Sequence, residues 1–137
     1  MNSIEDAQKE IIDEFSPFED WFEKYEHIIE LGKALETSEG LRKEENSISG
    51  CQSEVWLKVE GEDGRIRIMA DSDAMITRGM IALLVRVLDG QKPEDVANAK
   101  LYFLDEIGLK SNLSPSRANG LGNIIKRIKD SIRQNEI

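Results

Sequence analysis

The sequence of 137 residues has few of the side chains that bind metals or form disulfides: it contains one cysteine and one histidine. A single cysteine excludes an internal disulfide bond, which fits a reducing compartment. These two residues are also too few for the zinc, haem or iron–sulfur sites that proteins build from cysteine and histidine. A phosphate-binding loop and a Gly-rich dinucleotide fingerprint are absent as well. We therefore expect no bound metal and no resident cofactor.

Long apolar runs and an excess of basic residues are also missing. No apolar stretch approaches the roughly 20 residues of a membrane helix. The N-terminal residues MNSIEDAQKE lack the basic and apolar regions of a signal peptide. The formal net charge of −9 would repel a polyanion. We expect a cytoplasmic protein that binds neither nucleic acid nor a membrane.

The charge is distributed unevenly along the chain. Residues 1–47 hold 14 acidic and 5 basic side chains, whereas residues 111–137 hold 2 acidic and 5 basic ones. Such an imbalance is typical of solvated helix faces. It also fits a face that is complementary to a protein partner.

Helical spacing of apolar residues predicts several helices in what we expect to be a single domain over residues 1–137. The first covers residues 3–14, and Ser16-Pro17 is a start signal for a second that runs to about residue 35. A third, apolar around most of its girth, is predicted to be capped by Asp71 or Ser72 and to end near Gly90. Shorter helices are expected from residue 93 and over 101–107, and a last one from residues 114–115.

Strand-like alternation is confined to the middle of the chain. The stretch EVWLKVEGEDGRIRIMA, residues 54–70, predicts a hairpin with its turn at Asp63-Gly64. The polar stretch before it predicts a loop with one short edge strand. The order of elements predicts an α+β fold, a small antiparallel sheet of about three strands with helices packed on one side.

Cys51 is the first candidate functional residue. A lone cysteine is most often a small buried apolar residue. Cys51 lies instead in the polar segment NSISGCQSEVW, just before the predicted hairpin. Gly50 allows a tight turn that leaves one side of the thiol uncovered, and Gln52 can donate a hydrogen bond to it. The thiol is therefore either a packing residue or a group presented to another molecule.

Two charged residues are further candidates. Arg117 is predicted to be the third residue of the last helix, where the helix dipole disfavours a cation. It either pairs with a structural carboxylate or serves an anionic group. Asp73, at the start of the buried helix, either complements the dipole or lies near Arg117 or the thiol. His27 is explained most simply as a structural residue, and no pattern brings it to Cys51 for a Cys–His hydrolase.

Three blocks, NSISGCQSEVW, DSDAMITRGMIALL and LSPSRANGLGNIIKRI, resemble the SufE family of sulfur acceptors, which includes the CsdE-type proteins. The resemblance extends to WFEKYEHIIELGKAL and covers nearly the whole chain. It implies an α+β fold like that of the scaffold protein IscU. It also implies that Cys51 accepts sulfur as a persulfide from a cysteine desulfurase of the SufS or CsdA type, which carries the pyridoxal phosphate. The acceptor stimulates that enzyme and passes the sulfur to an iron–sulfur scaffold complex of the SufBCD type.

The chemistry needs little from the acceptor itself. Sulfane-sulfur transfer is a thiol–disulfide type of exchange, for which one accessible thiolate is sufficient. Asp73, Arg117, Gly50 and Gln52 lie in the matching blocks and are expected to support Cys51. The alternative is a non-covalent regulator of the desulfurase in which Cys51 is structural. In both hypotheses the protein acts on a partner rather than as a stand-alone enzyme.

Overall fold

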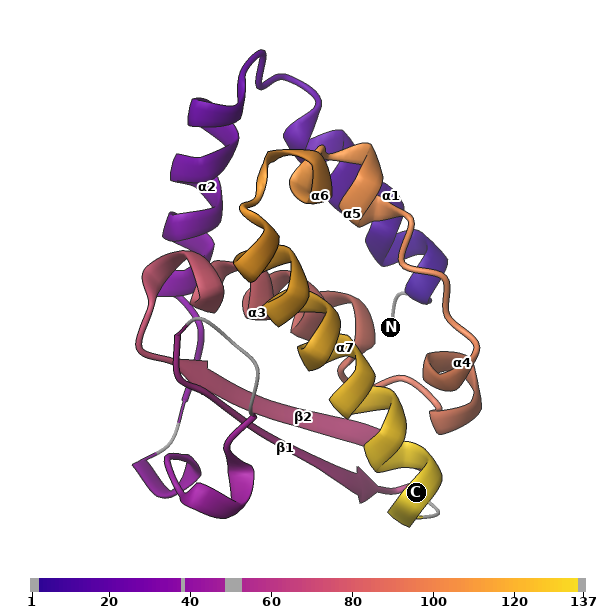
Figure 1. Ribbon diagram of the computed structural model, residues 1–137. Coiled ribbons are helices and arrows are strands. Elements are labelled where there is room, and N and C mark those ends of the chain that lie inside the picture. The colour runs from indigo at the N-terminus through magenta and orange to yellow at the C-terminus, as the bar shows by residue number, and fades with distance from the viewer. Residues whose placement is uncertain (1–2, 38, 49–52, 136–137) are drawn as a thin grey trace.

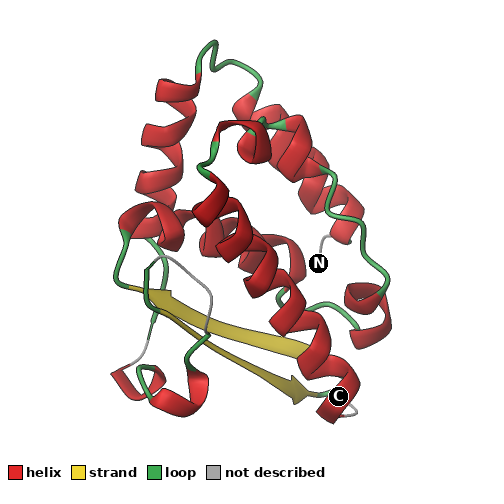
Figure 2. Ribbon diagram, viewed as in Figure 1, coloured by secondary structure: helices red, strands yellow, loops and turns green. Residues whose placement is uncertain are grey.

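The computed structural model describes residues 3–37, 39–48 and 53–135. In this part of the chain, seven α-helices and one antiparallel hairpin form an α+β fold (Figures 1 and 2). The elements in chain order are α1 (Ile4–Phe15), α2 (Trp21–Lys33), the 3₁₀ turns η1 (Glu39–Leu41) and η2 (Glu44–Asn46), β1 (Val55–Glu62), β2 (Arg65–Ser72), α3 (Met75–Leu88), α4 (Pro93–Ala97), α5 (Phe103–Glu106), α6 (Leu109–Asn112) and α7 (Pro115–Asn135).

The sheet of the described residues has two strands, so the expected third strand is wrong. β1 pairs with β2 in a register that runs from Val55 opposite Ser72 to Glu62 opposite Arg65. The predicted turn is confirmed, because Asp63 and Gly64 both have positive φ, 54° and 78°, as a two-residue hairpin turn of this hand requires. Beside β1, the preceding segment forms only an isolated bridge, between residues 47 and 56.

The hairpin buries one face under helices. Ile66, Ile68 and Ala70 of β2 are buried, whereas Arg67 between them is exposed. This alternation places one face in the core, where α3 packs on β2 and α7 contacts β1. α3 also packs along α2, and Figure 1 shows the helices gathered above the hairpin. The prediction that α3 would be buried is confirmed, since nine of its residues are buried.

The second helix begins later than its start signal predicts. Ser16 closes α1, and its backbone N–H donates to Asp13 O. α2 starts at Trp21, with Asp20 as its N-cap accepting from the Glu23 N–H at 2.9 Å. The Phe18 ring packs edge-on against the Phe15 ring, 5.8 Å between centroids. Because of this packing, the residues around Pro17 form the turn between α1 and α2.

The cap predicted for the central helix is also wrong. Asp71 and Ser72 belong to β2, and α3 has Ala74 as its N-cap with no side-chain cap hydrogen bond. Asp71 is drawn away by ion pairs with two arginines described below. Other local predictions are confirmed: Ser3 caps α1 through the Asp6 N–H, and Gly90, just after α3, has a φ of 80°.

Candidate functional site

Cys51, Gly50 and Gln52 lie outside the described residues. The site is therefore built from the residues on both sides of residues 49–52, and from Asp73 and Arg117. Ser53 is two residues from Cys51, so covalent geometry limits the distance between their Cα atoms to about 7 Å. The contacts of Ser53 thus identify the elements that hold the described chain directly after residues 49–52.

Ser53 is hydrogen-bonded to α3, and Glu54 to the two residues before its N-cap. The Ser53 hydroxyl shares a hydrogen bond of 3.0 Å with the hydroxyl of Thr77, a buried residue of α3. The Glu54 N–H donates to Asp73 Oδ1 at 3.1 Å, and the Asp73 N–H returns a bond to Glu54 O at 3.3 Å. Ser72 Oγ also donates to Glu54 O, at 2.7 Å. The chain that leaves residues 49–52 is held at two consecutive positions.

Arg117 reaches the same place from the last helix. Its backbone N–H donates to Ser114 Oγ at 3.3 Å, which confirms Ser114 as a cap. Its guanidinium donates from Nη1 to Thr77 Oγ1 at 3.5 Å. A hydroxyl that accepts from Arg117 keeps its proton to donate onward, so Arg117, Thr77 and Ser53 form a chain of three polar groups. The cavity among them has a volume of only about 10 Å³, which leaves no room for a ligand.

Asp73 and Arg117 bind different residues of this site. The Asp73 carboxylate is committed to the Glu54 backbone and the residue is exposed. Within the described ranges, no ion pair joins Asp73 to Arg117: Asp73 binds the Glu54 backbone, and Arg117 reaches Ser53 only through Thr77. Thr77 was missed by sequence reasoning, because a threonine within an apolar helix gives no sign that two other segments converge on its hydroxyl.

Two positively charged groups lie near Ser53, with the Asp73 carboxylate bound to the neighbouring residue. Among the described residues, α3 begins without a side-chain cap and without an acidic residue in its first turn. Its N-terminal N–H groups therefore carry the positive end of the helix dipole. The guanidinium of Arg117 adds a full positive charge beside Thr77. A thiolate near Ser53 would be stabilised by both groups.

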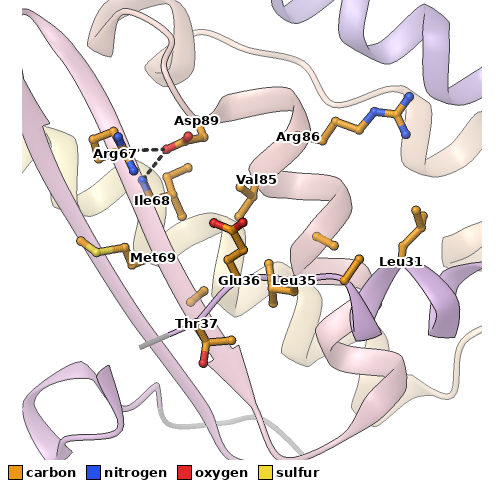
Figure 3. A pocket seen from close by; sticks show the side chains of 13 residues that line it. Leu31, Leu35, Glu36, Thr37, Arg67, Ile68, Met69, Val85, Arg86 and Asp89 are labelled. Atoms are coloured by element: carbon orange, nitrogen blue, oxygen red, sulfur yellow. Dashed lines mark hydrogen bonds and ion pairs between the residues drawn. The ribbon is translucent and has the colours of Figure 1, made fainter. Parts of the chain in front are cut away.

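The larger pocket in Figure 3 is separate from this site. It encloses about 470 Å³ between the end of α2, β2 and α3. On its wall Asp89 Oδ1 accepts from the Ile68 N–H at 2.7 Å and lies 3.7 Å from Arg67 Nε (Figure 3). Neither Ser53 nor Thr77 lines it. The pocket is consequently not part of the candidate site.

Neither a metal centre nor a bilayer-spanning helix is found among the described residues. No group of three or more His, Cys, Asp or Glu side chains there is placed to hold a metal ion. In the same part of the chain, no helix combines the length and the apolar composition needed to cross a bilayer.

Together, these features define a small α+β protein in which hydrogen bonds to α3 and to the residues before it hold Ser53 and Glu54, which follow the only cysteine in the sequence. The chain belongs to the SufE family, whose model, described as an Fe-S metabolism associated domain, matches residues 9–132. Family membership implies a sulfur-acceptor role in iron–sulfur metabolism and a cysteine desulfurase as partner.

Similar proteins cover most of the chain. It is 38% identical over 130 residues to an uncharacterized SufE-like protein of Rhizobium etli, covering 90% of this chain and 88% of that one. The corresponding values for a SufE-like protein of Rhizobium meliloti are 38%, 88% and 90%. For one of Synechocystis they are 36%, 87% and 76%.

A solved structure shows the same fold. The solution structure of a hypothetical protein from Thermus thermophilus matches with a TM-score of 0.76 and 21% identity. The match covers 93% of this chain and 94% of that one.

Proposed function

We propose that this protein accepts sulfur from a pyridoxal-phosphate-dependent cysteine desulfurase as a persulfide on Cys51, and that it stimulates that enzyme. It then passes the sulfur to an iron–sulfur scaffold complex of the SufBCD type. The observation that carries this proposal is the SufE family match over residues 9–132, which spans the only cysteine of the chain. The proposed reaction takes place in the cytoplasm, and the pyridoxal phosphate stays with the desulfurase.

The transfer step is an exchange at sulfur. The Cys51 thiolate attacks the terminal sulfur of the desulfurase persulfide, and a new S–S bond forms. The S–S bond within the desulfurase breaks, and its cysteine leaves with the electron pair as a thiolate. The proton on the terminal sulfur stays with that sulfur or passes to solvent. No electrons are gained or lost overall, so the step needs no oxidant or reductant.

The residues around Ser53 support this step through electrostatics and position. Both the attacking thiolate and the product persulfide are anionic. The uncapped start of α3 and the Arg117 guanidinium favour such anions. The hydrogen bonds of Ser53 to Thr77 of α3, and of Glu54 to Asp73 just before α3, fix the exit of the segment. We propose Asp73 as a residue that holds this exit and Arg117 as one that stabilises the anion.

The test compares wild-type protein with Cys51→Ser after incubation with a cysteine desulfurase and L-cysteine. Mass spectrometry should detect a gain of about 32 Da, one sulfur atom, on wild-type Cys51 and none on the variant. Stimulation of sulfide release should also be lost in the variant, while its circular dichroism spectrum stays that of the wild type. Full stimulation by Cys51→Ser would refute the covalent mechanism and would support a non-covalent regulator.

A further inference from the structure

An arginine ties the segment before Cys51 to the hairpin. Arg42 Nε donates to Asp71 Oδ2 at 2.9 Å, and its guanidinium carbon lies 4.6 Å from the centre of the Trp56 ring. The Arg42 side chain is 46% exposed, whereas that of Asp71 is only 3% exposed. Asp71 and Trp56 are directly paired in the hairpin. A residue of the 39–48 segment thus reaches across the sheet face to a buried carboxylate.

Asp71 connects this arginine to the rest of the protein. Its Oδ1 lies 3.7 Å from Arg78 Nε of α3 and accepts from the Ser72 N–H at 2.8 Å. Arg78 in turn donates from Nη2 to Leu35 O, just after α2, at 3.4 Å. Arg78 Nε is buried with no hydrogen-bond partner among the described residues, so the Asp71 charge is what compensates it. One buried carboxylate therefore joins the 39–48 segment, α3 and the end of α2.

Further contacts hold the same segment as far as its last described residue. The Ile48 N–H donates to Val55 O at 2.9 Å. Arg127 of α7 donates from its two terminal nitrogens to Ser47 O and Glu45 O, each at 3.5 Å. Ile48 is three residues before Cys51. Hydrogen bonds therefore hold the chain on both sides of residues 49–52, at Ile48 and at Ser53.

We propose that Arg42 is a positioning residue for sulfur transfer. Through Asp71 and Trp56 it fixes the 39–48 segment, and with it the direction in which the chain enters residues 49–52. Without this anchor, the segment occupies the transfer-competent arrangement for only a fraction of the time, and the transfer rate constant falls by that fraction. The inference rests on the proposed function, because it assumes that sulfur is transferred to Cys51. Arg42 itself acts through Asp71 and does not contact the sulfur.

The experiment measures single-turnover sulfur transfer from a persulfide-loaded cysteine desulfurase at several desulfurase concentrations. Arg42→Ala should lower the saturating rate constant about tenfold and leave the half-saturating concentration unchanged within about twofold. The final amount of persulfide per molecule should stay at the wild-type value, because the acceptor is slower and not unfolded. Arg42→Lys, which keeps a cation within reach of Asp71, should recover most of the rate.

Arg67→Ala is the matched control. Arg67 lies in β2, the strand that also contains Asp71, and its side chain is 54% exposed. It forms ion pairs of 3.7 Å to Asp89 and 3.8 Å to Glu62. The Arg67→Ala variant should accept sulfur at the wild-type rate. A wild-type rate constant for Arg42→Ala would overturn the positioning role, and so would a final persulfide yield that falls in parallel with the rate. If the wild type itself gains no persulfide, the proposed function fails, and the positioning role fails with it.

Discussion

Replacement of Gly79 by alanine should push two helices of the core apart. α2 and α3 touch through glycine, since a Cβ at Gly79 would lie 2.7 Å from the carbonyl carbon of Ile28 and closer still to its oxygen. On the facing helix, a Cβ at Gly32 would lie 2.7 Å from Gly79 N. Backbone atoms form most of these contacts, and backbone cannot swing aside as the end of a flexible side chain can.

The magnitude follows from the overlap. Non-bonded carbon atoms prefer about 3.5–4.0 Å, so α2 would have to retreat by about 1 Å. Overpacking of a close-packed core costs about 1–3 kcal/mol, and rigid backbone at the contact places Gly79→Ala at the upper end. The higher helix propensity of alanine offsets this cost by about 1 kcal/mol relative to glycine. The expected net loss is about 2 kcal/mol of unfolding free energy.

Gly122→Ala is the matched comparison. Gly122 lies within α7 and is exposed, and a Cβ added there would have no atom of another residue within 4 Å beyond its own helix turn. The same substitution at this position should stabilise the protein by about 1 kcal/mol. In urea unfolding, the two variants should differ by about 3 kcal/mol, a midpoint separation of more than about 1 M at ordinary slopes. A Gly79→Ala midpoint at or above that of the wild type would refute the close-contact reasoning.

Two further predictions concern charged residues. Burial raises the pKa of the Glu14 carboxyl, but hydrogen bonds from His27 and Arg86 outweigh it and bring the pKa below the ordinary 4.5. This contribution to stability is present above the unfolded-state pKa and is lost as the pH falls through the folded one. Unfolding free energy should therefore decrease more between about pH 6 and pH 3 in the wild type than in Glu14→Gln; equal slopes would contradict this. Arg117→Ala should slow sulfur transfer several-fold and change the unfolding midpoint little. The control variant Lys126→Ala, on the same helix and 76% exposed, should change neither the transfer rate nor the midpoint. A wild-type transfer rate for Arg117→Ala would contradict the role assigned to Arg117.

Local signals in the sequence predicted most of the elements correctly. Asp63-Gly64 marks the hairpin turn, Ser3 caps the first helix and Ser114-Pro115 opens the last, all as expected. Each of these features depends on residues within four positions of one another. The backbone conformations and hydrogen bonds of caps and tight turns are therefore encoded locally.

The failures occurred where a local signal competed with a distant partner. Ser16-Pro17 has the composition of a helix start, but Phe18 packs against the His27 ring of α2, 5.1 Å between centroids, and the segment forms a turn. Asp71 has the composition of a helix cap, but it extends β2 and binds arginines. A cap contributes about 1 kcal/mol, and burial of apolar groups with paired charges exceeds that contribution.

The sequence by itself determined the α+β order of elements, the family and Cys51 as the candidate sulfur acceptor. Only the tertiary structure decided which polar groups hold the described residues on either side of residues 49–52. Arg42 meets Asp71 across 29 positions, and Arg117 meets Thr77 across 40. Periodicity can assign a residue to a face of its own helix or strand, but the partner of a long charged side chain depends on how separate elements pack.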